Sequence, residues 1–128
     1  MKLPPALIAY WITTVLTAAS YVAGGLGDLI QPADMLAEIG SLGYPLYFFS
    51  ILGVWKLGAA VAILAPALPR LKEWAYAGIC FNLTGAFASH LFVSDPFGKT
   101  ITSVIVLAIA AASYVLRPAS RKLPGPRL

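Results

Sequence analysis

The sequence predicts an all-α integral membrane protein, a four-helix bundle with both termini in the cytoplasm. Three observations support this prediction: four long apolar runs, a shortage of charged residues, and an uneven placement of the basic residues along the chain. Of the 128 residues, 59% are hydrophobic and 11% are charged, whereas about a quarter of an average soluble domain is charged. We expect a single four-span domain over residues 1–117 and a basic, proline-rich, disordered cytoplasmic tail over residues 118–128.

The four apolar runs have about the length that a helix needs to cross a bilayer, roughly 20 residues. A soluble helical protein with a very apolar core is the alternative, but such a protein does not require runs of this length. A signal peptide cleaved near residues 17–19 is a second alternative for the first run, although the apolar stretch continues past that point. We expect the spans over residues 5–26, 44–65, 71–93 and 100–116.

The first span carries polar residues on one face. They recur at alternating spacings of four and three, which places them on one side of a helix: Tyr10, Thr14, Thr17, Tyr21, Gly24 and Asp28. The glycines of the Gly24-Gly25-Leu26-Gly27 stretch are expected to loosen or end this helix. Residues 31–43 then form either a short interfacial helix, which the spacing of their apolar residues allows, or a polar loop.

The second and third spans are expected to be antiparallel neighbours, because only a short turn between Pro66 and Pro69 joins them. Pro45 suits the first turn of the second span. Small residues gather on one side of the third span, a pattern by which membrane helices approach one another closely: Ala75, Gly78, Asn82, Gly85, Ala86 and Ser89. The fourth span contains no charged residue and is expected to serve packing.

The placement of the basic residues predicts the topology. With four spans, the two termini and the turn between the second and third spans lie on the same side. That side holds most of the basic residues: Lys2, Arg70, Lys72, Arg117, Arg121, Lys122 and Arg127. The opposite side holds Lys99 and four acidic residues, Asp28, Asp34, Glu38 and Asp95. Because basic loops are retained in the cytoplasm, both termini are expected to be cytoplasmic.

Lys56 is the residue that most strongly indicates a function. A lysine at the centre of an apolar span costs about 2.5–3.5 kcal/mol on insertion, so it must face a partner, a cavity or water. At 1.5 Å per residue, Lys56 and Asn82 each lie roughly 15 Å from the cytoplasmic ends of their helices. Thr17 reaches about the same level. We therefore expect a polar cluster of Thr17, Lys56 and Asn82 near the midplane, and a second group of Asp28, His90 and Asp95 near the outer end.

The polar residues also have structural interpretations, which the sequence leaves open. Lys56 could extend between helices to reach backbone carbonyls, and Glu73 could be stabilised by its helix N-terminus and by the neighbouring basic residues. Asn82 suits an interhelical hydrogen bond. His90 is the only histidine, and without clustered carboxylates it does not predict a metal site, so no metal is expected.

Several function classes are excluded by the sequence. No basic patch is interleaved with exposed aromatic residues, so no nucleic-acid partner is expected. Cys80 is the only cysteine, which excludes an intramolecular disulfide and a cysteine-cluster metal site. The phosphate-binding, nucleophile-elbow and zinc-protease motifs are also absent from the sequence.

The sequence resembles the DoxX-like family of small bacterial membrane proteins across nearly its whole length. The resemblance is carried by Gly24-Gly25, Leu42-Gly43-Tyr44-Pro45, Leu52-Gly53-Val54-Trp55-Lys56, Pro66, Lys72-Glu73-Trp74-Ala75-Tyr76-Ala77-Gly78, Gly85-Ala86 and Ser89-His90. It implies a four-helix bundle of the bacterial inner membrane. Some relatives are linked to quinone-dependent electron transfer, which implies a quinone as a candidate cofactor. Here a lone cysteine excludes dithiol chemistry and one histidine cannot supply a heme-ligand pair, so an electron-transfer role would require a redox partner subunit.

We expect the chain to be a binding or accessory subunit of a membrane redox assembly that holds an apolar small molecule, a quinone or a lipid. The expected ligand-binding residues are Thr17, Tyr21, Lys56, Glu73, Tyr76, Asn82 and His90. The alternative is a membrane-embedded isomerase or oxidoreductase with Lys56 or Glu73 as its acid–base. A purely structural bundle is a third hypothesis. Membrane lipid is an expected partner, and the small-residue faces permit a homo-oligomer without requiring one.

Overall fold

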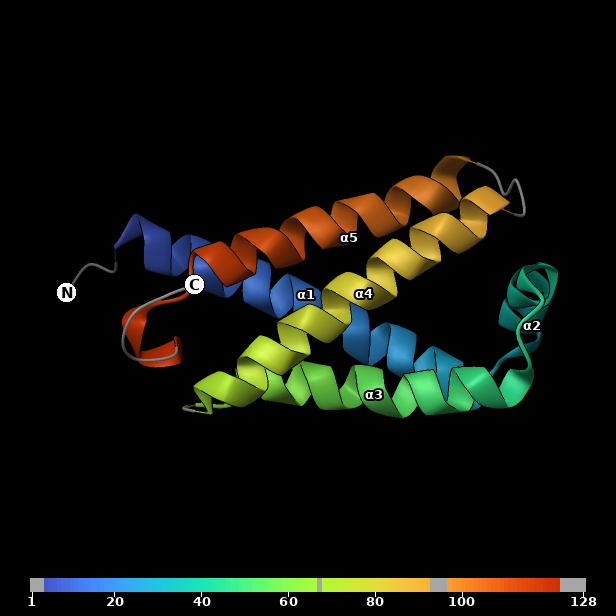
Figure 1. Ribbon diagram of the computed structural model, residues 1–128, viewed down its shortest axis with the longest axis horizontal. Coiled ribbons are helices and arrows are strands. Elements are labelled where there is room, and N and C mark those ends of the chain that lie inside the picture. The colour runs from blue at the N-terminus through green and yellow to red at the C-terminus, as the bar shows by residue number, and fades with distance from the viewer. Residues whose placement is uncertain (1–3, 67, 93–96, 123–128) are drawn as a thin grey trace.

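The computed structural model describes residues 4–66, 68–92 and 97–122, and all regular structure within these ranges is helical. The long helices are α1 (Pro5–Ile30), α3 (Leu46–Leu64), α4 (Pro69–Phe92) and α5 (Phe97–Val115). They run back and forth along one axis and form an elongated bundle (Figure 1). Helix α1 packs against α3 and α5, and α4 packs against the same two helices. The prediction of an all-α, four-helix chain is therefore confirmed for the described residues.

The two ends of the bundle differ in charge. Figure 1 shows the start of α1, the end of α3, the start of α4 and the segment after α5 at one end, and α2, the end of α4 and the start of α5 at the other. We call these the shared end and the far end. Arg70, Lys72 and Arg117 belong to the shared end, whereas Asp28 and Asp34 belong to the far end. The first and the last described segments thus lie at the same end, while the cytoplasmic location of that end stays a prediction.

The prediction that glycines end the first helix is wrong. Helix α1 continues to Ile30 and ends at Gln31, whose φ of 53° is left-handed and whose N–H donates to the Gly27 carbonyl at 2.8 Å. The glycines serve packing instead. A methyl group on Gly25 would lie 3.0 Å from the Gly53 carbonyl oxygen, and one on Gly53 would lie 2.7 Å from that of Gly25. The absence of both side chains lets the backbones of α1 and α3 approach closely.

The connection between α1 and α3 is helical, which decides between the two alternatives for residues 31–43. It forms α2 (Ala33–Ile39) followed by a short 3₁₀ turn, η1 (Gly40–Leu42). Gln31 ties the start of this connection to α3, because its amide nitrogen donates to the Leu46 carbonyl at 3.0 Å. At the next connection, α5 already begins at Phe97, three residues before the fourth span predicted from residue 100; residues 93–96, including Asp95, lie outside the described ranges.

The predicted small-residue face of α4 does not form a close helix contact. A methyl group added at Gly78 or Gly85 would meet nothing within 4 Å among the described residues. The buried side chains of α4 are Lys72, Ala75, Tyr76, Ile79 and Leu83. Because large side chains occupy the contact face of α4, the small residues beside them border open space instead of a neighbouring backbone.

The segment after α5 folds back onto the bundle as far as the structure describes it, up to residue 122. It forms a second 3₁₀ turn, η2 (Ala119–Arg121). Arg121 donates to the Ile63, Leu64 and Ala65 carbonyls at 3.1–3.3 Å and stacks on Trp11 at 4.6 Å. The expectation of disorder is wrong for this part of the tail, because Arg121 satisfies carbonyls that the end of α3 leaves without intrahelical donors. Residues 123–128 lie outside the described ranges.

Lys72 serves the same helix end from inside the bundle. Its side chain is fully buried, and its ammonium group donates to the Ala62 carbonyl at 3.0 Å and to the Ala65 carbonyl. These bonds satisfy further carbonyl groups in the last turn of α3, and the positive charge suits the negative end of the helix dipole. Lys72 therefore holds the α3–α4 turn together and is a structural residue.

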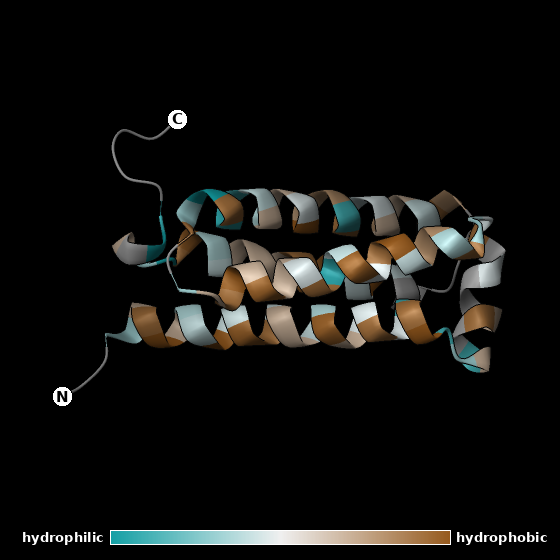
Figure 2. Cartoon of the chain, turned by 90° about the horizontal axis from the view of Figure 1, so that it is seen from below, coloured by the Kyte–Doolittle hydropathy of each residue, from teal (hydrophilic) through white to brown (hydrophobic). Residues whose placement is uncertain are grey.

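The interior of the bundle holds polar side chains beside its hydrophobic core, and large apolar side chains cover much of its outer surface. Buried polar side chains include Thr14, Thr17, Asp28, Lys72 and Ser113. Large apolar side chains are exposed along the helices: Ile12, Val15, Leu26, Ile51, Val54 and Val61, among others. In Figure 2 hydrophobic and neutral colours cover most of the long helices, and hydrophilic colour is confined to a few bands. Lipid, in contrast to water, favours this arrangement, because a bilayer solvates apolar side chains and excludes polar ones.

Candidate functional site

A central cavity of about 450 Å³ lies toward the far end of the bundle, and side chains of α1, α3, α4 and α5 line it. Leu42 of η1 also borders it. Its polar and charged lining residues are Ser20, Tyr21, Asp28, Lys56, Asn82, His90, Thr102 and Ser103, and its apolar lining includes Phe49, Leu52, Leu83 and Val106. A cavity of mixed lining that touches every long helix is the usual form of a small-molecule site in a helical bundle.

The close contact of α1 with α3 places a carboxylate beside an ammonium group in this cavity. Lys56 Nζ lies 2.9 Å from Asp28 Oδ2, and the two side chains are 19% and 6% exposed. Gly24 lies beside the lysine, and a methyl group there would be in ordinary contact with Nζ at 3.5 Å. The buried glycine contact between Gly25 and Gly53 lies one turn or less from both charged residues on their helices. The glycines therefore set the spacing at which the pair forms.

The Asp28–Lys56 pair explains how a charged side chain is tolerated inside an apolar span. Two opposite charges at this distance neutralise each other, which is how ionisable groups persist within membrane helices. The contact lacks hydrogen-bond geometry, and Asp28 Oδ2 is a buried oxygen with no hydrogen-bond partner in the described part of the chain. That oxygen retains the capacity to accept a hydrogen bond from a molecule in the cavity.

Tyr21 and Asn82 form a second polar pair in the same cavity. The Tyr21 hydroxyl donates to Asn82 Oδ1 at 2.8 Å, which joins α1 to α4. The side-chain amide of Asn82 thus accepts through its oxygen and keeps its NH₂ group to donate. Together the two pairs offer a carboxylate, an ammonium, a hydroxyl and an amide within one cavity.

A second, apolar cavity of about 450 Å³ adjoins the central one between α3 and α4. Both are lined by Tyr21, Leu52, Lys56 and Asn82. The rest of the apolar cavity is lined mainly by Ala, Gly, Leu and Trp residues. Trp55 and Trp74 line it and are 71% and 68% exposed, so the cavity opens on the outer surface of the bundle. It lies beside the small residues of α4 that meet no neighbouring backbone.

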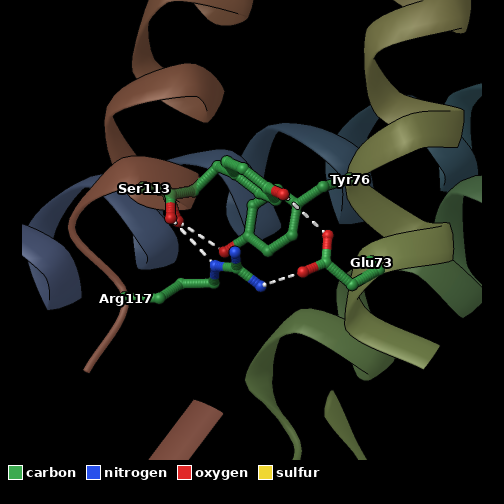
Figure 3. A network of polar contacts seen from close by, with 5 residues as sticks. Glu73, Tyr76, Ser113 and Arg117 are labelled. Atoms are coloured by element: carbon green, nitrogen blue, oxygen red, sulfur yellow. Dashed lines mark hydrogen bonds and ion pairs between the residues drawn. The ribbon is translucent and has the colours of Figure 1, made fainter. Parts of the chain in front are cut away.

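Glu73 and Arg117 belong to a separate polar network near the shared end (Figure 3). Glu73 of α4 accepts a hydrogen bond from Arg117 at 3.0 Å and another from the Tyr114 hydroxyl at 2.8 Å. The Arg117 guanidinium lies over the Tyr114 ring, 3.9 Å from its centre. The sequence predicted that the neighbouring basic residues supply the counter-charge of Glu73. The structure instead pairs Glu73 with Arg117. This arrangement ties α4 to the end of α5.

A chain of hydroxyl groups continues this network into the bundle. Ser113 lies 2.6 Å from the Thr14 hydroxyl and 2.7 Å from the Tyr76 hydroxyl, which connects α5 to α1 and α4. All three residues are buried. Hydroxyl groups that bond to each other across helices are a common way to join membrane helices. The role of this chain is interhelical attachment.

The structure brings together four of the seven predicted ligand-binding residues. Tyr21, Lys56, Asn82 and His90 line the central cavity. Thr17 is buried but lines neither cavity, and its hydroxyl donates within α1 to the Thr13 carbonyl at 2.8 Å. The predicted midplane cluster therefore lacks Thr17, because a threonine in a helix satisfies its hydroxyl on the preceding turn.

The other two predicted residues belong elsewhere. Glu73 and Tyr76 line a smaller cavity of about 320 Å³ between α4 and α5, on the side of Tyr114 and Cys80. Sequence reasoning placed Asp28 at the far end without pairing it to Lys56, and it missed Ser113, Tyr114 and Arg117. Arg117 follows Tyr114 by three residues and Ser113 by four, and this spacing was a signal for the group, because side chains three or four residues apart are neighbours on a helical turn.

Comparison with known families agrees with this architecture. Residues 12–113 match the DoxX-like family. The chain belongs to the DoxX-like family. Searches among curated proteins and among solved structures gave no match.

Membership in the DoxX-like family supports a membrane location. Pro5–Ile30 and Leu46–Leu64 are long and apolar enough to cross a bilayer, and Thr100–Val115 is apolar but shorter. Together with the apolar exterior, these helices support the character of a helical membrane protein. The match to the DoxX-like family does not by itself assign a ligand or a reaction.

Proposed function

We propose that this DoxX-like protein binds an apolar small molecule with a polar head, a quinone or a lipid, as a binding or accessory subunit of a membrane redox assembly. One observation carries the proposal: a polar cavity and an apolar cavity adjoin and have Tyr21, Lys56 and Asn82 in common. A molecule with a polar head and an apolar tail fits these two cavities, because its head contacts polar side chains and its tail contacts apolar ones.

The proposal includes a location and a topology. All four long helices would cross the bacterial inner membrane, with the shared end in the cytoplasm. The charge difference between the ends supports this orientation. It is tested by accessibility labelling of single cysteines in a Cys80→Ala background, one replacing Arg70 and one replacing Asp34. We expect the first to react only from the cytoplasm and the second only from outside; the opposite pattern would refute the orientation.

An enzyme is the second candidate, and the position of Lys56 favours it. Lys56 is the basic group that lines both cavities, so it could move a proton on a bound substrate. Glu73, the other predicted acid–base, is engaged by Arg117 and Tyr114 in a different part of the bundle. Turnover of an added lipid or quinone that disappears in Lys56→Met would support an enzyme, whereas retention without turnover supports a binding subunit.

The proposed function is tested by mass spectrometry of the small molecules that copurify from native membranes. We expect a defined apolar compound with the wild type and its loss from Lys56→Met. Arg70→Met is the matched control, since it also removes one cationic side chain but lies exposed near the other end of the bundle. A wild type that retains only bulk lipid, or a compound retained equally by Lys56→Met, would refute the proposal.

A further inference from the structure

The central cavity carries an internally balanced charge. Its formally charged lining residues are Asp28 and Lys56, which face each other at 2.9 Å. Each is therefore already neutralised by a side chain of the protein. A ligand with a net charge would find no free counter-charge among the described residues that line the cavity, and a low-dielectric site makes an uncompensated charge costly by several kcal/mol.

We propose that the cavity selects an uncharged polar head, a hydroxyl or carbonyl group, at the end of a long apolar tail. This inference rests on the proposed function and names the class of ligand. A hydroxyl group can donate to Asp28 Oδ2, which lacks a hydrogen-bond partner among the described residues. A hydroxyl or carbonyl oxygen can accept from the NH₂ of Asn82 or from the ammonium of Lys56. Neither contact adds a charge to the site.

The position of the second cavity decides where the tail lies. Because Tyr21, Lys56 and Asn82 line both cavities, a head between these residues places the attached tail among Leu52, Ala59 and Ile79. The exposed Trp55 and Trp74 rings border the outer side. The tail therefore reaches the surface of the bundle that faces lipid, and the ligand enters sideways from the bilayer.

The ion pair also predicts how the selectivity can be switched. Asp28→Asn leaves an unpaired ammonium group in the cavity, so an anionic head becomes its counter-charge. Lys56→Met leaves an unpaired carboxylate, so a cationic head is favoured. The double variant Asp28→Asn/Lys56→Met removes both charges, and such a replacement of a buried pair is often tolerated by the fold; it should prefer an uncharged head again.

The test is a competition experiment on the full-length protein in lipid nanodiscs. A hexadecanol carrying a photoreactive diazirine on its tail labels the protein, and unlabelled hexadecanol, hexadecanoate and hexadecylamine compete. We expect hexadecanol to compete with the wild type at a concentration at least about tenfold lower than either charged amphiphile. Hexadecanoate should compete best with Asp28→Asn and hexadecylamine with Lys56→Met. Partitioning of each amphiphile into the bilayer is the same for all variants and does not affect a change of rank between them.

One control variant and the negative results complete the test. Arg70→Met, which removes an exposed cationic side chain outside both cavities, should keep the wild-type ranking and so assign the selectivity to the pair. Saturable labelling with the same ranking in all variants, or with no head preference in the wild type, would overturn this inference and leave the proposed function standing. Labelling that is not saturable in any variant would overturn the proposed function itself, and this inference with it.

Discussion

The glycine contact between α1 and α3 gives the sharpest prediction about the fold. In Gly53→Ala the new methyl group would lie 2.7 Å from the Gly25 carbonyl oxygen and 2.9 Å from Leu29 Cγ, where ordinary contact begins at 3.4 Å. The oxygen belongs to a helix backbone and cannot turn aside, so α1 and α3 must separate. Overpacking of this kind costs about 1–3 kcal/mol. Because the same contact positions Asp28 beside Lys56, ligand binding should weaken as well.

Gly58→Ala is the matched control on the same helix. A methyl group at this position would meet nothing within 4 Å, and replacing glycine by alanine inside a helix gains up to about 1 kcal/mol. Both variants gain this helix preference, so the difference between them measures the steric cost alone. The measurement is the free energy of unfolding in mixed detergent micelles, followed by circular dichroism. If Gly53→Ala is as stable as Gly58→Ala, the close approach of α1 and α3 does not exist in the native protein.

Four further variants probe the polar network and the α3 helix end near the shared end. Ser113→Ala should lower the free energy of unfolding by about 1–2 kcal/mol, because two buried hydroxyls lose their partner across the helices. Glu73→Gln should cost about 1–3 kcal/mol, since it leaves the Arg117 guanidinium buried without its carboxylate; Glu73→Gln/Arg117→Met should recover part of this loss. Arg121→Ala should cost about 1–2 kcal/mol and speed amide hydrogen exchange in the last turn of α3, because the carbonyls there lose their donor.

Each of these variants has a control on the same chain. Ser20→Ala removes an exposed hydroxyl that bonds within α1 at 2.9 Å, and a change of more than about 0.5 kcal/mol there would be unexpected. Lys122→Ala removes the basic residue next to Arg121 and should leave hydrogen exchange in α3 unchanged. Equal effects of Arg121→Ala and Lys122→Ala would refute the capping role, and a double variant less stable than Glu73→Gln alone would contradict the ion-pair account.

The sequence by itself determined the elements and the buried face of the first helix. Tyr10, Thr14, Thr17, Tyr21 and Asp28 are all buried in α1, as their spacing predicts. This works because the 3.6-residue period is a local property of the backbone, and the identity of the neighbouring helices does not alter it. The shortage of charged residues likewise indicated the membrane class, because composition does not depend on how the helices pack.

Only the tertiary structure decided which polar groups meet. Estimating depth from the backbone placed Lys56 level with Thr17, yet its ammonium group lies at Asp28, nearer the far end. Side chains of a helix point toward its N-terminus, and the N-terminus of α3 is at the far end. Glu73 likewise points toward the start of α4 and meets Arg117. These pairings depend on the rotation and offset of neighbouring helices, which the glycines set for α1 and α3, and spacing along one helix does not encode them.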